Sequence, residues 1–228
     1  MNKLYSIAVM CFFFSNCNTQ SPISENKNLS VNMINVNTDP IITKLVEDHY
    51  GNLFNYMNHD QIINTVWEEA GGADKLKKIL IDEEAPMKAR FLVSEVLFTK
   101  SFGFVVEVGA ELVAKIYANA MANNLTGMAN SWGLLYEYND EGPVGINWLL
   151  LREAAIPELF KLLDNETIHM YHGSEEATVG NSYQFRVKDF AAYYICKIKQ
   201  IEAVYHETHA ARDTEIEKLK ILLAKDKK

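Results

Sequence analysis

Cysteine is scarce in this chain, and the three cysteines that it has cannot form a disulfide framework. Cys11 lies within an apolar start, Cys17 follows that start, and Cys196 lies in a strongly helical pattern. The residues after position 17 therefore hold a single cysteine, which excludes a disulfide-stabilised fold. Cys196 stands beside Ile195 and Ile198 on a predicted helix. We expect it to be a small core residue and not a catalytic thiol, because burial makes a thiol inert.

Clustered positive charge is also missing. The chain carries 22 Lys and Arg against 30 Asp and Glu, a formal net charge of −8. A surface that binds nucleic-acid phosphates needs clustered Lys and Arg, and the basic runs here are short, as in the tail KLKILLAKDKK. Nucleic acid is therefore not expected as a partner.

The sequence lacks the motifs of several enzyme classes. Gly71-Gly72 is not followed by the G-K-[ST] of a phosphate-binding loop, and no G-x-S-x-G turn surrounds Ser174, which lies near His172. The acidic runs Glu68-Glu69 and Asp82-Glu83-Glu84 stand at predicted helix ends, where solvated caps are usual. These patterns indicate no catalytic residue, and we expect no cofactor.

The first seventeen residues have the plan of a secretion signal. Met1-Asn2-Lys3 is a short positive start, and the apolar run from Leu4 to Phe14 is too short to span a bilayer. The ending FSNC resembles a bacterial lipobox, although Phe14 and Asn16 differ from the usual residues. The resemblance implies a lipid on Cys17 and a membrane anchor at the bacterial cell envelope, on the periplasmic side or the surface. Secretion after cleavage behind Cys17 and a buried N-terminal helix are the alternatives.

Helical periodicity begins after a tether. Residues 18–38 are rich in Asn and Ser and show no sustained period, which indicates a flexible tether. Asp39 then fits a helix N-cap, and Pro40 fits the first helical position. From there apolar residues recur at three and four positions, the spacing of one helix face. This spacing predicts helices at 40–54, 60–69, 73–81, 86–100, 104–123, 128–138, 146–153, 156–163 and 187–198, with a last helix that begins at the capping box Thr214 to Glu217.

A period near 40 residues runs through the middle of the chain. When Leu76, Ile116 and Leu159 are set in register, the intervals are 40 and 43 residues. Three stretches carry the pattern: LKKILIDEEAPMKARFLVSEVL, the pair of helices within 104–138, and IPELFKLLDN with RVKDFAAYYI. Two helices per unit at this period resemble the pattern of HEAT-type repeat proteins, over about two-thirds of the chain after position 17.

The resemblance implies an all-α fold in which antiparallel helical hairpins stack as a short HEAT-like α-solenoid, within one domain at 39–228. Such arrays are mostly binding scaffolds, and the family by itself assigns no substrate. In that family an Asp in the turn of a repeat and a basic residue early in its second helix tie neighbours together. Asp82 with Arg90, and Asp164 with Arg186 or Lys188, match these parts.

A polar insert at 165–184 interrupts the third hairpin. Excursions of this length inside a compact repeat are uncommon, and are usually functional or disordered. The insert mixes aromatic, amide and acidic side chains with glycine, as binding loops do, and its acidic pair favours a partner protein with a basic surface. A loop packed over the end of the array is the alternative. The residues that we expect to contact a partner protein are His169, Tyr171, His172, Glu175, Glu176, Asn181 and Tyr183.

The same insert permits a metal site as a second interpretation. His169, His172 and Glu175 are spaced three apart, and two imidazoles with one carboxylate are a ligand set of catalytic zinc. No known ligand signature matches this spacing. His206 and His209 are also three apart and lack the H-E-x-x-H pattern.

Pattern, charge and N-terminal signal together predict a non-catalytic, lipid-anchored or secreted scaffold that binds a protein. A small acidic array at the envelope suits an immunity or inhibitor protein that blocks a toxin or a hydrolase. A metal-dependent hydrolase that uses residues 169–176 is the alternative function. A purely structural envelope lipoprotein is a third.

Overall fold

The computed structural model describes residues 39–54, 58–101, 103–133, 141–173, 175–203 and 206–225. These residues all belong to one compact unit. The predicted signal at 1–17 with its Cys17, and the predicted tether at 18–38, lie outside the described residues.

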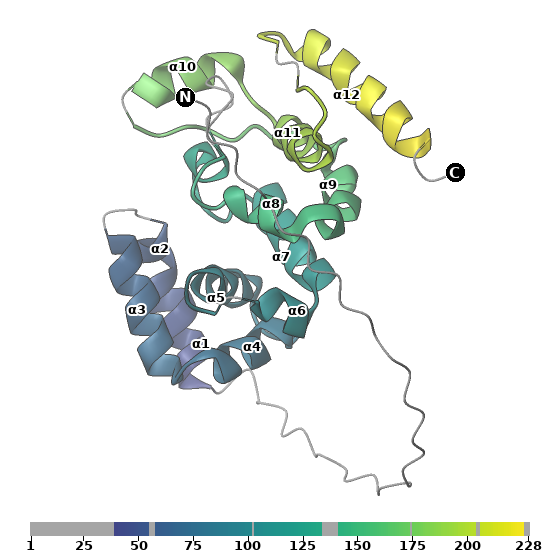
Figure 1. The fold of residues 1–228 in the computed structure, drawn as a ribbon. Helices are drawn as coiled ribbons and strands as arrows, with labels where there is room; N and C mark the ends of the chain where they lie inside the picture. The colour runs from purple at the N-terminus through teal and green to yellow at the C-terminus, as the bar shows by residue number, and fades with distance from the viewer. Residues whose placement is uncertain are drawn as a thin grey trace, which may run out of the picture. The chain divides into compact units, whose positions relative to one another are not determined.

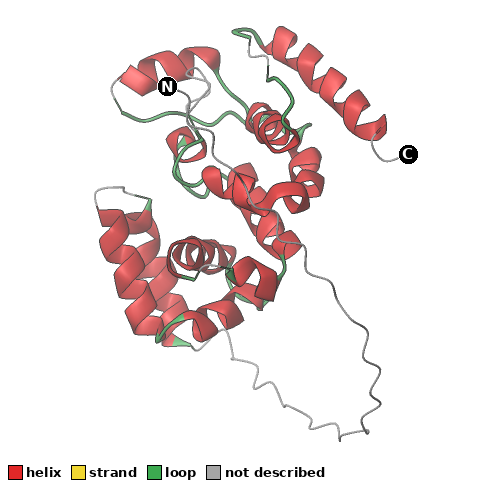
Figure 2. Ribbon diagram, in the orientation of Figure 1, coloured by secondary structure: helices red, strands yellow, loops and turns green. Residues whose placement is uncertain are grey.

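The described part of the chain is helical and holds no β-strand, which confirms the predicted all-α fold (Figure 1, Figure 2). None of its helices is long and apolar enough to cross a membrane. The elements are α1 (Pro40–Lys44), a π-helical turn η1 (Leu45–His49), α2 (Tyr50–Leu53), α3 (His59–Ala70), α4 (Ala73–Ile81), α5 (Met87–Lys100), α6 (Phe104–Val108), α7 (Ala110–Ala122), the 3-10 turn η3 (Ala129–Trp132), α8 (Ile146–Leu151), the 3-10 turn η5 (Arg152–Ala155), α9 (Ile156–Leu162), α10 (Glu175–Tyr183), α11 (Val187–Lys199) and α12 (His209–Lys225).

Local sequence signals set several helix ends. The Asp39 side chain accepts a hydrogen bond from the Ile41 N–H at 3.0 Å, as an N-cap does, and Pro40 is the first residue of α1. Helix α3 ends at Gly71, whose φ of 72° is left-handed and costs glycine little. Both ends agree with the sequence prediction.

The helices pack in chain order. Helix α4 packs on α5, α5 on α7, α7 on α9, α9 on α11, and α11 on α12. Amphipathic helices need such neighbours, because each has one apolar face to bury. Neighbour-to-neighbour packing is what stacked hairpins require, while the HEAT-like solenoid itself stays a prediction.

Several predicted helices differ from those observed, among them 146–153, which is α8 followed by the 3-10 turn η5. The predicted helix 104–123 is two helices, because Gly109 between α6 and α7 has a φ of 95°. The predicted helix 128–138 is one 3-10 turn at Ala129–Trp132, and residues 134–138 lie outside the described ranges. The last helix starts at His209 and not at Thr214, whose hydroxyl donates to the Ala210 carbonyl inside α12 at 3.0 Å.

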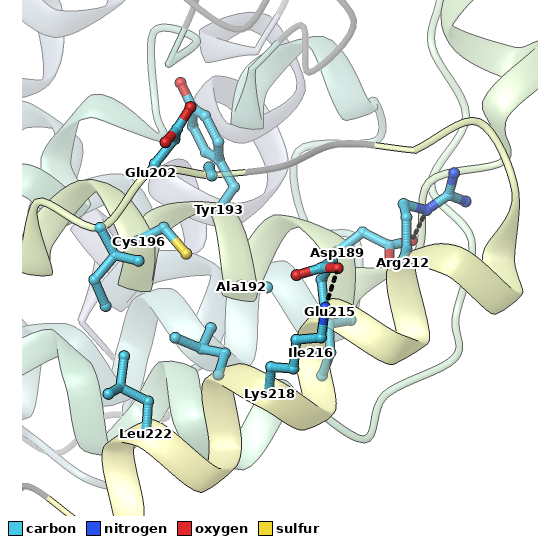
Figure 3. A pocket seen from close by; sticks show the side chains of 13 residues that line it. Asp189, Ala192, Tyr193, Cys196, Glu202, Arg212, Glu215, Ile216, Lys218 and Leu222 are labelled. Atoms are coloured by element: carbon cyan, nitrogen blue, oxygen red, sulfur yellow. Dashed lines mark hydrogen bonds and ion pairs between the residues drawn. The ribbon is translucent and has the colours of Figure 1, made fainter.

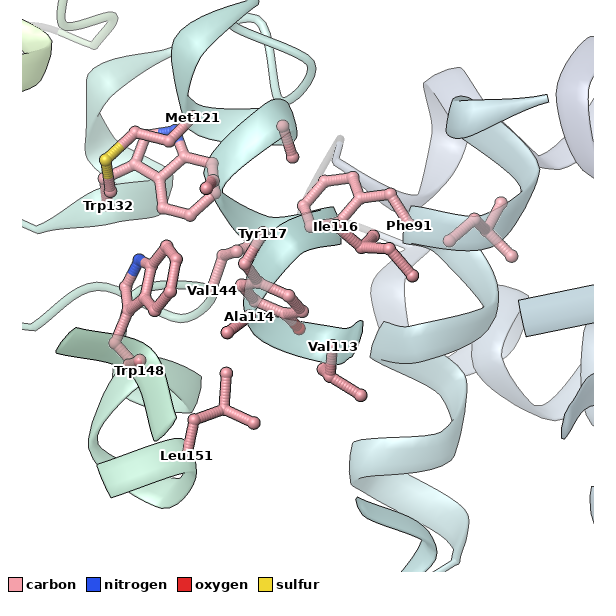
Figure 4. Packing of buried hydrophobic residues seen from close by; sticks show 14 of the residues in the cluster. Phe91, Val113, Ala114, Ile116, Tyr117, Met121, Trp132, Val144, Trp148 and Leu151 are labelled. Carbon is pink, nitrogen blue, oxygen red and sulfur yellow. The ribbon is translucent and has the colours of Figure 1, made fainter. Parts of the chain in front are cut away.

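Large aromatic side chains fill the centre of the core (Figure 4). Phe91 on α5 meets Tyr117 on α7 edge-on at 5.3 Å between ring centroids, and Tyr117 meets Trp148 on α8 at 5.7 Å. Trp132 and Trp148 have no exposed surface, while Trp67 is half-buried against the same core. These rings therefore link α5, α7 and α8 within the core.

One carboxyl group is buried within this core. Glu95 on α5 accepts hydrogen bonds from the Tyr117 hydroxyl and, at 3.2 Å, from the Asn147 amide, which also donates to the Tyr117 hydroxyl at 2.9 Å. Burial raises the pKa of Glu95 to about 8, although both hydrogen bonds lower it. Glu95 is therefore a neutral acid at pH 7 that links α5, α7 and α8.

Candidate functional site

The insert starts as an extended segment, Glu166–Gly173, that runs beside the start of α11. The Val187 N–H donates to the Thr167 carbonyl at 2.8 Å, and the His169 N–H donates to the Phe185 carbonyl at 3.2 Å. Ile168 and Arg186 form an isolated antiparallel bridge between these bonds. The two ends of the insert are therefore held together as a neck.

Side chains along the extended segment alternate between interior and solvent. His169 and Tyr171 are 1% and 2% exposed, whereas Ile168 and Met170 between them are 41% and 50% exposed. His172 is also exposed. Extended backbone points successive side chains to opposite sides, so the segment has an anchored inner face and an apolar outer face.

Two asparagines fix the backbone of this segment. The Asn181 side chain accepts from the Tyr171 N–H at 2.7 Å and donates to the Tyr171 carbonyl at 3.0 Å. The Asn130 side chain does the same for His172, at 2.8 and 3.0 Å. A third bond runs from the Ala129 N–H to the Met170 carbonyl at 2.9 Å. Asn181, which we expected at a partner surface, thus uses its amide inside the insert.

The second half of the insert is a helix and not the loop that we predicted. Helix α10 contains Gly180, and a Cβ at that position would meet the Tyr171 ring at 2.5 Å. The close approach of backbone and ring explains a glycine inside the helix. Tyr183, the last residue of α10, is half-buried and stacks on Phe185 with ring centroids 5.3 Å apart.

The residues predicted to contact a partner therefore fall into four groups. His169 and Tyr171 are buried anchors, and Asn181 and Tyr183 hold the insert together. His172 is exposed. Glu175 and Glu176 are the first residues of α10, and their side chains, like Cys17, lie outside what the structure describes. Ile168 and Met170 were not predicted, because the type of an apolar residue does not show whether it is exposed.

The proposed metal ligands do not share one environment. His169 is buried beside the Phe190 ring, 6.1 Å between centroids, and burial lowers its pKa to about 4, whereas His172 is exposed. Within the described ranges, no group of three His, Cys, Asp or Glu side chains lies close enough to hold a metal ion. His209 bonds instead with the Gln184 carbonyl at 2.9 Å.

A charged cluster holds the base of the insert against α11 and α12. We call it the charged clasp: Glu166, Arg186, Lys188, Asp189, Arg212 and Asp213. Arg186 binds Asp189, Glu166 and Asp213, with nitrogen–oxygen distances of 2.8 to 3.3 Å, and Lys188 lies 2.7 Å from Asp213 and also binds Glu166. Burial lowers the pKa of Arg186, but the bonds to Asp189 and Asp213 outweigh it and raise the pKa. The guanidinium therefore stays charged.

The ion pairs implied by the HEAT-type resemblance differ from those observed. Asp164 pairs with Lys220 on α12 at 2.7 Å, and not with Arg186 or Lys188. Arg90 uses its Nε to donate to the Leu80 carbonyl at 2.9 Å and forms no ion pair with Asp82. Burial lowers the pKa of Arg90, although the nearby charges of Glu83 and Asp82 act to raise it. Arg90 still has part of its expected role, because its bond to the Leu80 carbonyl ties α5 to α4.

Comparison of the chain with protein-family models, with curated proteins and with solved structures found no match.

Proposed function

We propose that this chain is a non-catalytic binding protein of the bacterial cell envelope, and that the outer face of Glu166–Gly173 contacts a partner protein. The proposal rests on the alternation of buried and exposed side chains along this segment. Ile168 and Met170 are exposed, while the neighbouring His169 and Tyr171 are buried. Exposed apolar side chains placed together on a surface are typical of interaction sites.

The rigidity of the segment supports the same proposal. Its backbone is bonded to Asn130, Asn181 and the neck beside α11, so little conformational entropy remains to be lost when a partner binds. A partner would receive Ile168 and Met170 as two anchors from an extended chain, the geometry of strand-like recognition. Glu175 and Glu176, which follow at the start of α10, favour a partner whose apolar pocket is bordered by basic residues.

The place of action and the role are part of the proposal. A lipid on Cys17 would hold the domain at the envelope, with residues 18–38 as the tether. A small acidic scaffold at that place suits an immunity or inhibitor protein. Labelling with radioactive palmitate tests the anchor: we expect incorporation into the full chain and none into Cys17→Ser. A full chain without label would contradict the anchor and leave the binding surface to be tested separately.

The binding surface is tested with a double substitution and a matched control. Ile168→Asp with Met170→Asp places charge on the outer face, while Val106→Asp does the same on α6, where Val106 is 90% exposed. A protein captured from the envelope of the source bacterium is identified, purified and titrated against all three chains. We expect the double variant to bind at least about tenfold more weakly, and Val106→Asp to bind like the unchanged chain. Equal binding by the three chains would refute the surface.

A further inference from the structure

A pocket of about 150 Å3 lies between α11 and α12, apart from the outer face of the insert (Figure 3). Both helices and the residues just after α11 contribute to it. Its apolar lining includes Ala192, Cys196, Ile201, Ile216, Leu219 and Leu222. Apolar walls with a few polar groups are typical of small-molecule sites.

The size of the pocket is unusual for a helix pair. Protein interiors are close-packed, with few voids larger than a water molecule. Here the short side chains Ala192 and Cys196 stand on α11 where α12 passes, and Leu222 on α12 stays 41% exposed at the same place. An apolar cavity of about 150 Å3 accepts benzene or xenon. The space is therefore sufficient for one aromatic ring or one branched alkyl group.

Three carboxylates, Asp189, Glu202 and Glu215, and two cations, Arg212 and Lys218, line the pocket. Asp189 lies 3.3 Å from the Nε of Arg212, and Glu215 pairs with Lys218 at 2.9 Å. Arg212 also donates from Nη1 and Nη2 to the carbonyls of His206, Glu207 and Tyr183, so these nitrogens are occupied.

Glu202 is the remaining charged group, and it is exposed. It has no hydrogen bond or ion pair to any other described residue. In Figure 3 its carboxylate lies at the Tyr193 end of the pocket, away from the Asp189–Arg212 pair.

The surroundings of Glu202 do not cancel its charge. Lys197 lies 5.3 Å from the Tyr193 ring centroid, but its ammonium is paired with Glu141 at 2.8 Å. Lys199 is paired with Glu153 at 2.9 Å. Helix α11 ends at Lys199, and the C-terminal end of a helix carries a partial negative charge. A cation at this end of the pocket is therefore favoured over an anion.

We propose that this pocket binds a small organic cation. One aromatic or branched alkyl group fills the space between α11 and α12, and a primary ammonium lies at the Glu202 carboxylate. The apolar walls provide affinity, and Glu202 selects the charge.

Three probes of nearly equal shape test the proposal: benzylamine, benzyl alcohol and benzoate, titrated into the full chain at pH 7 with binding followed by ligand-observed NMR. We expect benzylamine to bind about five- to tenfold more tightly than benzoate, with benzyl alcohol between them, because an exposed carboxylate attracts the ammonium and repels the carboxylate of the probe by a modest amount each. Added salt should narrow the difference. No binding of any probe, or benzoate as tight as benzylamine, would overturn the proposal.

Two substitutions separate the apolar and the charged contributions. Ala192→Leu fills the pocket, so all three probes should bind at least about tenfold more weakly, whereas Ala224→Leu on the exposed side of α12 should change nothing. Glu202→Gln should reduce benzylamine to the affinity of benzyl alcohol and leave benzyl alcohol unchanged. A Glu202→Gln chain that still prefers the amine would refute the assigned carboxylate.

Methyl NMR of the unchanged chain gives an independent readout, should Ala192→Leu not fold. Benzylamine in the pocket must shift the methyl signals of Ile216 and Leu219, which line it, and leave Ile63 on α3 unmoved. Shifts at Ile63 without shifts at Ile216 would place the probe elsewhere and contradict the proposal.

Discussion

Arg186 and Asp189 form a bidentate ion pair that is almost completely shielded from solvent. Arg186 donates from Nε to Oδ2 of Asp189 at 3.1 Å and from Nη2 to Oδ1 at 3.0 Å, and the two side chains are 3% and 1% exposed. The Arg186 N–H donates to the same carboxylate at 2.8 Å, which also caps α11. Since Arg212 lies 3.3 Å from this carboxylate, Asp189 joins the base of the insert to α12.

The first prediction is that Asp189→Ala strongly destabilises the chain. It removes the carboxylate that Arg186 and Arg212 share, while Arg186 keeps Glu166 and Asp213. Because hydrogen bonds to charged groups contribute about 1.5–3 kcal/mol each, we expect a loss of roughly 2–4 kcal/mol. Chemical denaturation followed by circular dichroism measures the free energy of unfolding. Asp164→Ala is the matched control, because Asp164 is 83% exposed where it pairs with Lys220 and should lose about 1 kcal/mol or less. Equal losses in the two variants would contradict the role of the buried pair.

The regular helices were predictable because their signal is local. Residues 73–81 and 156–162 repeat apolar side chains at helical spacing, and the caps Asp39 and Gly71 mark ends by their own chemistry. Helix α10 was not predictable in this way. Its sequence EEATVGNSY has no apolar stripe and several weak helix formers, and it lies against the Tyr171 ring, so tertiary packing stabilises it.

The candidate site was predictable as a segment but not as a surface. The composition of the insert pointed to 165–184, yet which side chains face inward depends on the neck between Thr167 and Val187. His169 and Tyr171 can be buried or exposed equally well, so their types do not reveal the alternation. The charged clasp was missed for a related reason: Glu166 and Asp213 are far apart in sequence, and only the folded chain brings both of them to Arg186.

The second prediction concerns the buried acid Glu95. The folded chain keeps its proton up to about pH 8, whereas the unfolded chain releases it near 4.5. The folded state therefore binds more protons in between, and the free energy of unfolding must fall as pH rises from 4.5 to 8, by roughly 3 kcal/mol at pH 7. Glu95→Gln keeps an acceptor for Tyr117 and Asn147. It should remove this contribution to the decrease of the free energy of unfolding with pH. An unchanged slope would show that Glu95 does not titrate as described.

The third prediction concerns His169, whose titration should make the chain less stable as pH falls, the opposite of the effect of Glu95. Burial keeps its imidazole neutral in the folded chain down to about pH 4, whereas an unfolded histidine gains a proton near 6.5. The unfolded state therefore binds more protons in this window, and stability is lost as pH falls from 6.5 to 4, by roughly 3 kcal/mol. Neither ring nitrogen has a hydrogen-bond partner within the described residues.

His169→Phe tests this by removing the titrating group while keeping a ring against Phe190. We expect higher stability at pH 5 than in the unchanged chain, because no buried nitrogen is left without a partner. Since Glu95 acts in an overlapping window, the comparison is made in the Glu95→Gln background. NMR titration of the His169 ring provides the direct check, and protonation near pH 6.5 in the folded chain would contradict the prediction.

The last prediction concerns the contact that holds α10 on the extended segment. Gly180→Ala places a methyl group where the Tyr171 ring lies, at 2.5 Å from its nearest atom, and the ring cannot move without leaving its buried site. We expect a loss of roughly 1–3 kcal/mol and faster hydrogen exchange at the Tyr171 N–H, which Asn181 now holds. Gly51→Ala is the matched control, since Gly51 is also helical and has open space at its Cβ; there alanine should stabilise by about 0.5–1 kcal/mol. If Gly180→Ala behaved like Gly51→Ala, α10 would not rest on Tyr171, and the outer face with Ile168 and Met170 would lose its rigid support.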